Sequence, residues 1–402
     1  MTDTSRPSLF CISSYEKGQP FLREAAQLGV NVVLLTTDKL RDADWPKDIL
    51  AGFHTMPPDL TPEQVLHTVM YLARDRRIDR VVALDEFDLD SAALLREHMR
   101  LPGMGQTLSR LFRDKLAMRS ESRRNGIAVP EFTGVFLYDD LRVFMQHVKG
   151  PWLLKPRMNA SAIGIKPILH ADDLWPVLDQ LGDLQSHYLL EQFVSGEVFH
   201  VEGVTWNGKL LCSIPNKYGR PPMETMHEGG VFTTHNLALD SEDGKGLIEI
   251  HQRLIEAFGL PSGVTHTKFI KAAADGKFYF LETAARVGGA YIADMVEFAT
   301  GVNPWVEWAR IEVALARGEE YTLAVPRQEF AGSIISLAKQ DVPDLSGYTD
   351  PEIALRLHQQ HHAGIIVTSH SEARVRELVD SYGRRFLDDF CAVIPAPDKA
   401  TS

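Results

Sequence analysis

The first hundred residues alternate between short apolar runs and amphipathic stretches. Apolar runs at 8–13, 30–36 and 80–84 predict buried strands, and the stretches at 20–28 and 62–74 predict helices between them. Strands that alternate with helices indicate a parallel sheet covered on both faces. The loop after the first strand holds a single glycine, so the glycine-rich fingerprint of a dinucleotide site is absent.

The pattern changes beyond a helix-forming run at 107–126, which ends on Asn125-Gly126. An α+β pattern follows, with strands and helices mixed. Its predicted strands lie at 152–156, 164–169 and 188–194, and its predicted helices at 139–147 and 172–181.

Two hairpins dominate the next segment. The first covers 198–215 and turns at Asn207-Gly208, a strong turn pair. The second covers 264–283 and turns near Asp275-Gly276, which places Lys268 opposite Glu282. A helix at about 244–258 separates them. Asn303-Pro304 opens another helix that runs to about 317, and a mixed tail extends to about 394.

Composition narrows the class of protein. The chain has 402 residues, 44% apolar and 24% charged, which suits a soluble protein of two or three lobes. Its net charge of −12 argues against nucleic acid or an anionic membrane as a partner. Three distant cysteines give no disulfide framework, and neither a signal core nor a membrane span is present, so we expect a cytoplasmic protein.

Lys155 opens the list of candidate site residues. It closes a strand, and the small-residue loop at 156–165 follows it. Such a loop can place backbone N–H groups over phosphates while the lysine neutralises their charge. An ordinary connection between two strands is an equally good interpretation of the loop alone.

Two further features could serve a nucleotide. Glu191 ends an apolar strand and is followed by Phe193, Val194 and Glu197, a strand edge that could meet an adenine and a ribose. A plain strand end explains these residues too. Lys115 lies within the predicted helix at 107–126, where most lysines are simply solvated.

The strand at 278–282 carries the strongest candidate. Glu282 ends it, Arg286 follows four residues later, and Gly288-Gly289 come next. A carboxylate suits Mg²⁺, and an arginine fork suits a carboxylate or a phosphoryl group. The glycines let a small ligand approach the backbone. A cross-strand ion pair between Lys268 and Glu282 is the alternative, but it leaves the arginine and the glycines unexplained.

Four motifs in this order resemble the ATP-grasp superfamily, in particular its carboxylate–amine ligase branch, which includes L-amino acid ligases. They lie at 112–130, 153–165, 189–203 and 263–289, and the resemblance extends from residue 8 to about 390. It implies an ATP-grasp fold of mixed α/β and α+β class. An N-terminal parallel-sheet (pre-ATP-grasp) domain would cover 1–106, a small lid subdomain with its linker helix 107–195, and a large subdomain with a C-terminal extension 196–402.

The resemblance also implies roles for the nucleotide residues. Lys115 and Lys155 would contact phosphates, and the loop 157–163, with Ser161, would cover them. Glu191, Phe193 and Val194 would line the adenine, and Glu197 would reach the ribose.

At the reacting end, the resemblance makes Glu282 the metal ligand and Arg286 the catalytic residue that stabilises the transferred group. Gly288 and Gly289 would border the acceptor carboxylate. His266 lies on the same hairpin and is a candidate for orienting substrate or taking a proton from the amine. A hydrogen-bonded structural histidine is the alternative there.

The implied activity joins a carboxylate to an amine. The carboxylate attacks the γ-phosphoryl group of ATP to give ADP and an acyl phosphate, and the amine then displaces phosphate. The implied cofactors are ATP and Mg²⁺, with Mn²⁺ as a substitute, and the partners are a small-molecule carboxylate, for which an amino acid is the natural choice, and an amine. A homodimer is the commonest closed assembly.

Two positions depart from the family pattern, which has a glutamate on one strand and Glu-x-Asn on the next. Lys268 stands at the first glutamate and Ala284 at the asparagine. An ammonium there would compete with Mg²⁺ for Glu282. Glu202 or Glu228 could replace the missing ligand, Lys268 could itself neutralise phosphate, or catalysis could be lost.

Three other classes of function therefore stay open. A biotin carboxylase-like subunit shares this nucleotide fold, although no biotin-attachment motif occurs. A nucleotide-binding module without turnover is favoured by Lys268 and Ala284. A structural or interaction protein would leave the constellation of lysines, arginine and glycines without a purpose.

Overall fold

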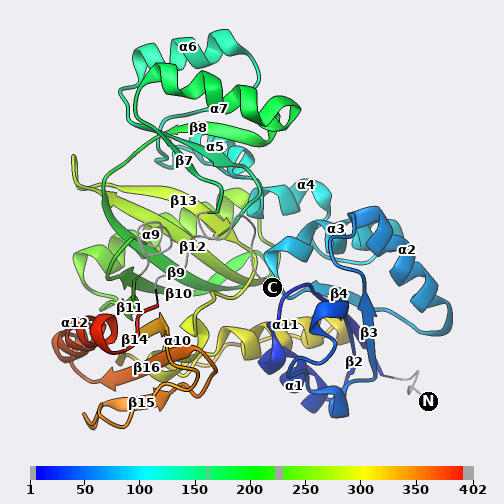
Figure 1. Ribbon diagram of the computed structural model, residues 1–402. Coiled ribbons are helices and arrows are strands. Elements are labelled where there is room, and N and C mark those ends of the chain that lie inside the picture. The colour runs from blue at the N-terminus through cyan, green and yellow to red at the C-terminus, as the bar shows by residue number, and fades with distance from the viewer. Residues whose placement is uncertain (1–5, 161–162, 222–229, 393–402) are drawn as a thin grey trace.

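The computed structural model describes residues 6–160, 163–221 and 230–392, and within them it contains three sheets (Figure 1). The first sheet has the order β3-β2-β1-β4, and every neighbouring pair is parallel. The predicted α/β arrangement of this segment is confirmed. Its strands are β1 (Ser8–Ser13), β2 (Asn31–Thr37), β3 (Gly52–Met56) and β4 (Arg80–Ala83), and its helices α1 (Gln19–Gln27), α2 (Pro62–Leu72) and α3 (Leu89–Met99).

The predicted helix at 107–126 is wrong as a single helix. It divides into α4 (Gln106–Ser109), a short 3-10 turn and α5 (Lys115–Arg124). The break occurs because the carboxylate of Asp114 accepts a hydrogen bond from Leu116 N at 3.0 Å and so caps a new helix. Lys115 is therefore the first residue of α5 rather than an interior one, and its backbone N–H donates to Arg157 O.

The second sheet is antiparallel and has the order β5-β8-β6-β7. Leu141 and Leu174, from the two helices of this segment, pack with Leu154 and Leu190 of the sheet to form a small separate core. Figure 1 shows both helices on the outer side of this sheet. The elements are β5 (Phe132–Gly134), α6 (Tyr138–His147), β6 (Trp152–Pro156), β7 (Lys166–Ile168), α7 (Leu174–Leu181) and β8 (Tyr188–Gln192).

The third and largest sheet has eight strands in the order β13-β12-β9-β10-β11-β14-β16-β15. Its strands are β9 (Gly196–Trp206), β10 (Lys209–Tyr218), β11 (Phe232–Asn236), β12 (Gly263–Ala272), β13 (Phe278–Ala284), β14 (Phe330–Leu337), β15 (Ile353–Arg356) and β16 (His362–Ser369). The tail of the chain thus completes this sheet, because β14, β15 and β16 form one end of it.

Helices cover both faces of the large sheet. Phe199 and Phe269 on one face pack against α9 (Glu242–Phe258), and Val204 and Val264 on the other pack with α10 (Ile292–Thr300) and α11 (Pro304–Arg317). The last helix, α12 (Glu372–Asp389), packs on β14 and β16. Alternate residues of β9 and β12 point to opposite faces, so the polar residues between Val198 and Val204 share the face opposite α9.

Both predicted hairpins are confirmed. Asn207 and Gly208 form the first turn with φ of 48° and 73°, the left-handed backbone that such a two-residue turn needs. In the second, Lys268 pairs with Glu282 across β12 and β13. The helix predicted to start at Asn303-Pro304 is α11, which Asn303 caps by accepting from Trp305 N at 3.0 Å.

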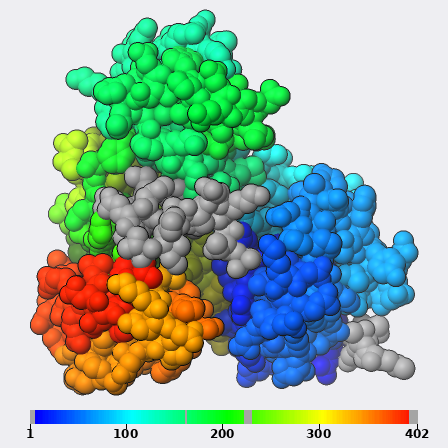
Figure 2. Space-filling model, in the orientation of Figure 1, coloured from blue at the N-terminus to red at the C-terminus, as the bar shows by residue number. Residues whose placement is uncertain are grey.

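The N-terminal sheet is anchored to the large sheet through α11. The rings of Phe21 and Trp308 meet edge to face at 5.4 Å, and Arg80 forms a buried ion pair of 2.8 Å with Glu312. Figure 2 shows the resulting outline, with the second sheet and its helices as a lobe that stands away from the other two. No helix of the described chain is long and apolar enough to cross a membrane.

Candidate active site

A cavity lies between the second sheet and the large sheet. Its walls combine apolar side chains such as Val198, Ile270 and Leu281 with several charged groups. Five residues predicted from sequence to bind nucleotide line it: Lys115, Lys155, Glu191, Phe193 and Val194. An apolar slot with a few charged groups at one end suits a nucleoside joined to phosphates.

The carboxylate of Glu191 is 1% exposed and is held by two cations. Arg119 Nε donates to it at 2.6 Å, and Lys155 Nζ donates to its other oxygen. Burial raises the pKa of Glu191, but Arg119 and Lys155 outweigh it and hold that pKa below its usual range. Glu191 therefore fixes Lys155 in place through its side chain. Arg119 was missed by the sequence reasoning, because a helical arginine gives no sign of an inward direction.

Two other residues predicted to bind nucleotide are not among those seen to line this cavity. Glu197 is exposed and pairs with Lys217 at 2.6 Å, and it does not line the cavity. Ser161, in the predicted covering loop 157–163, lies outside the described residues.

Glu282 lies between two ammonium groups. Lys115 Nζ is 2.9 Å from its Oε2, and Lys268 Nζ is 2.9 Å from its Oε1. Burial raises the pKa of Glu282, but the two lysines oppose this and hold it well below its usual range. Glu282 also raises the pKa of Lys268 against the effect of burial. The group is thus a carboxylate neutralised from both sides.

Arg286 pairs with a residue from the first sheet. Its Nε and Nη2 lie 3.1 and 3.0 Å from Glu86 Oε2, and its Nη1 donates to Val287 O at 2.8 Å. Glu86 follows β4, at the carboxyl end of the parallel strands, where ligands of open α/β sheets usually bind. The polar run after that strand was the available sign of a site residue.

A second, smaller cavity connects these groups. It brings Glu86 and Arg286 together with Lys115, Glu282 and His266, and Ala284 also lines it. Residues more than 190 positions apart in the chain therefore share one small space at the junction of the first and third sheets.

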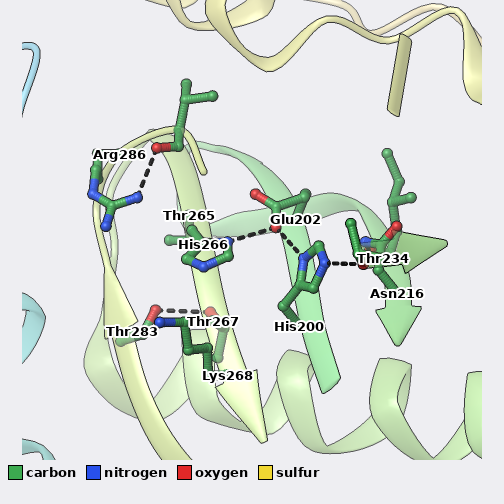
Figure 3. A network of polar contacts seen from close by, with 12 residues as sticks. His200, Glu202, Asn216, Thr234, Thr265, His266, Thr267, Lys268, Thr283 and Arg286 are labelled. Carbon is green, nitrogen blue, oxygen red and sulfur yellow. Dashed lines mark hydrogen bonds and ion pairs between the residues drawn. The ribbon is translucent and has the colours of Figure 1, made fainter. Parts of the chain in front are cut away.

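His200, Glu202 and His266 form a hydrogen-bonded row beside this cavity (Figure 3). Both histidines direct Nδ1 at Glu202 Oε1, at 2.7 Å from His200 and 2.6 Å from His266. His200 Nε2 lies 2.8 Å from Thr234 Oγ1. Burial opposes ionisation of Glu202, but the two imidazoles hold its pKa well below its usual range. Burial lowers the pKa of His200 to about 4.

The same three residues are the group within the described chain whose atoms could surround a metal ion. Their hydrogen-bond distances of 2.6 and 2.7 Å are shorter than the ~3.3 Å between neighbouring ligands of a tetrahedral ion with ~2.0–2.1 Å bonds. Mg²⁺ also prefers oxygen ligands to imidazole. Glu282 is the better fit, because Mg²⁺ is commonly held by one or two carboxylates together with substrate phosphates.

Gly288 lies directly against this row. A Cβ at residue 288 would stand 3.0 Å from His266 Nδ1 and 3.2 Å from Glu202 Oε2, whereas at Gly289 it would meet nothing within 4 Å. A side chain at 288 would therefore press on the Glu202–His266 pair. Glu202 Oε2 itself is buried and has no hydrogen-bond partner among the described residues.

Comparison with known proteins agrees with the resemblance seen in the sequence. The family model "ATP-grasp N-terminal domain" matches residues 22–103. The L-arginine-specific L-amino acid ligase of Bacillus subtilis is 24% identical over 264 residues, which are 63% of this chain and 63% of that protein. The match thus spans less than two thirds of that relative.

Solved structures extend the likeness to nearly the whole chain. The L-amino acid ligase from Bacillus licheniformis superposes with a TM-score of 0.73 at 19% identity, over 96% of this chain and 99% of that one. Biotin carboxylase from Campylobacter jejuni gives 0.69 at 12% identity, over 95% and 91%. The chain has the ATP-grasp fold, and its resemblance to the ATP-grasp carboxylate–amine ligases is confirmed.

Proposed function

We propose that this protein is an ATP-dependent, ADP-forming carboxylate–amine ligase. One observation carries the proposal: Arg286, Glu282 and Lys115 line one small cavity beside the larger, partly apolar one. The larger cavity would take the nucleoside of ATP between Phe193, Val194 and the sheet. Its phosphates would then extend toward Lys155 and Lys115, and the acceptor carboxylate would lie beside Arg286.

Positioning and charge neutralisation supply most of the rate in such a reaction. Lys115 and Lys155 neutralise phosphate oxygens, and Arg286 orients the carboxylate as it attacks the γ-phosphoryl group. Glu86 fixes the direction of that guanidinium. When bound, Mg²⁺ would add further neutralisation of the phosphates, with Glu282 as its protein ligand. Ion binding requires at least one of the two lysines on Glu282 to turn toward phosphate.

Each of the three segments predicted from sequence contains one of the three sheets, which supports a proposal for their roles. We propose that 1–106, 107–195 and 196–402 act as the N-terminal domain, the lid and the large subdomain, with Glu197 at the ribose end. We also propose an amino acid as the carboxylate and a cytoplasmic location.

A nucleotide-binding protein without turnover is the second candidate, and the ion pair between Lys268 and Glu282 favours it. A bicarbonate-dependent carboxylase is a third, because biotin carboxylase has this fold.

ADP release separates the three. Wild type and Arg286→Ala are compared with ATP and Mg²⁺ plus single amino acids, pairs of amino acids, or bicarbonate. The ligase predicts release that needs a carboxylate and an amine and that is lost in Arg286→Ala. Release with bicarbonate alone would identify the carboxylase, and tight ATP binding without release would identify the binding protein.

A further inference from the structure

The amine that attacks the activated carboxylate must first lose a proton. Amino groups are mostly ammonium ions near neutral pH, and an ammonium ion has no electron pair with which to attack. A ligase of this class therefore needs a proton acceptor close to the acyl group. This inference rests on the proposed function and concerns which side chain of the same site accepts that proton.

Most of the ionisable groups that line the small cavity are unsuitable as acceptors. Arg113, Lys115 and Arg286 are cations and can only donate. The carboxylates of Glu86 and Glu282 are engaged by Arg286 and by the two lysines. His266 is the remaining basic side chain among the described residues that line this cavity.

We infer that His266 is the base that takes the proton from the incoming amine, and that Glu202 and His200 are its positioning residues. The hydrogen bond to Glu202 fixes which nitrogen is free. A carboxylate oxygen only accepts, so Nδ1 of His266 carries the hydrogen that it donates to Glu202 Oε1 at 2.6 Å. Nε2 is then the nitrogen with a lone pair.

That nitrogen is available. Within 6–160, 163–221 and 230–392, His266 makes its hydrogen bond through Nδ1, and none is found at Nε2. Figure 3 shows the second ring nitrogen directed away from Glu202. His266 is 6% exposed, and it lines the small cavity.

Glu202 is suited to supporting a positive imidazole. It is 2% exposed, and His200 holds the same oxygen from the other side while Thr234 contacts the far nitrogen of His200. A buried carboxylate that fixes a histidine and stabilises its protonated form is the arrangement found in hydrolytic triads.

The neighbouring strand places a small side chain beside His266. His266 pairs with Ala284 on β13, so their side chains lie on the same face. Ala284 stands where the family pattern has asparagine, and this smaller side chain lines the same cavity as the imidazole. Glu282 and Arg286 lie two positions before and two positions after it in the chain. The acyl group held by Arg286 would thus lie close to His266.

The protons and bonds balance in two transfers. The ammonium ion gives one proton to His266 Nε2, and its freed electron pair forms the C–N bond to the acyl carbon. The bond from that carbon to the phosphate oxygen breaks, and phosphate leaves. The second proton of the attacking nitrogen goes to the departing phosphate, and the imidazolium returns its proton to solvent.

Hydroxylamine provides a sharp test, because it is a nucleophile that is largely unprotonated at neutral pH. Wild type, His266→Gln and a matched control, His235→Gln, are given ATP, Mg²⁺ and each proteinogenic amino acid, with either hydroxylamine or a second amino acid as nucleophile. His235 lies on the same sheet and is 7% exposed, but it does not line the small cavity. Hydroxamate and dipeptide are measured.

We expect His266→Gln to lose dipeptide formation by about 10²–10⁴-fold while hydroxamate formation stays within a few-fold of wild type. His235→Gln should keep both. Equal loss of both products in His266→Gln, or retention of both, overturns the role of His266 as a base. A wild type that forms neither product overturns the proposed function itself, which is a distinct result.

The positioning role of Glu202 has its own readout, the pH dependence of dipeptide formation. Because the Glu202 carboxylate stabilises the protonated imidazole, Glu202→Gln should shift the rising part of the pH profile to lower pH, lower the maximum rate of dipeptide formation and keep hydroxamate formation. An unchanged pH profile contradicts the role. The ionisable groups facing His266 that shape this profile are His200, Glu202, Lys268, Glu282, Arg286, Arg113, Lys115 and Glu86.

Discussion

Lys268 Nζ lies 2.9 Å from Glu282 Oε1, where the family pattern would have two acidic residues facing each other. The pair is part-buried and belongs to the wall of the larger cavity. The lysine therefore either competes with a metal ion or takes over some of its neutralising function. The proposed ligase requires that Lys268 neutralise phosphate charge. Lys268 can do so if it turns from Glu282 toward the phosphates.

Replacing Lys268 separates these possibilities. If it neutralises phosphate, Lys268→Met should lower substrate-dependent ADP release by about 10²-fold or more. If it only blocks the metal, Lys268→Glu should raise ADP release. Initial rates across a Mg²⁺ titration measure both. A rise in Lys268→Glu together with an inactive wild type contradicts the ligase.

Arg286 should be irreplaceable by lysine. Its fork engages Glu86 through two nitrogens while a third donates to Val287 O, and a single ammonium cannot reproduce this. Arg286→Lys should therefore lose about 10²–10³-fold in kcat with a smaller change in KM for ATP. Glu86→Gln should lose less, because the arginine remains. Equal kcat and KM values for Arg286→Lys and wild type would contradict a catalytic role for the Arg286 guanidinium.

Ionised Glu191 should make a large contribution to the free energy of unfolding, and this contribution should be lost at acid pH. Its folded-state pKa is lowered by Arg119 and Lys155, so its stabilising effect is fully present above its unfolded pKa of about 4.3 and is lost as pH falls through the folded value. Glu191→Gln leaves two buried cations unpaired and should cost about 3–5 kcal/mol at pH 7. The free energy of unfolding of Glu191→Gln should also fall less steeply than that of wild type as the pH is lowered.

Urea unfolding at pH 7 and at lower pH measures that effect. Glu131→Gln is the matched control, because Glu131 pairs with Arg123 at 2.9 Å but is 58% exposed. Its change should stay below about 1 kcal/mol. A similar loss in both variants would show that burial of the Glu191 pair is not the cause.

Glu282 should set the metal requirement. Removing Mg²⁺ with EDTA should abolish substrate-dependent ADP release in wild type. Glu282→Gln should raise the Mg²⁺ concentration needed for half-maximal rate by about 10–100-fold, as for other losses of metal-site residues. Metal titrations in the presence of ATP check this, and an unchanged requirement would show that another group holds the ion.

The sequence predicted the structure best at turns, hairpins and helix starts, where particular residue types favour particular backbone conformations. The pairing of Lys268 with Glu282 followed from counting outward from a turn, and period-two strands make such counting reliable. Asn207-Gly208 and Asn303-Pro304 are local signals, and the structure confirms both. The predicted helix at 107–126 failed because Asp114, which looks like any helical acidic residue, caps a second helix.

Contacts between distant segments were beyond sequence reasoning. Nothing local indicates that Glu86 meets Arg286, 200 residues away, or that Arg119 turns inward to Glu191. The row of His200, Glu202 and His266 depends on the register of β9 against β12, which one sequence does not reveal. Such contacts arise from tertiary packing, and they decide how the site works.

The most direct test of carboxylate activation follows an oxygen atom. An amino acid labelled with ¹⁸O in its carboxylate is incubated with the protein, ATP, Mg²⁺ and a second amino acid, and the released phosphate is analysed by mass spectrometry. The proposed ligase predicts that one labelled oxygen passes from the carboxylate to phosphate for each product formed. Phosphate that is released without the label would mean that water, and not the carboxylate, attacks ATP, and would contradict the account.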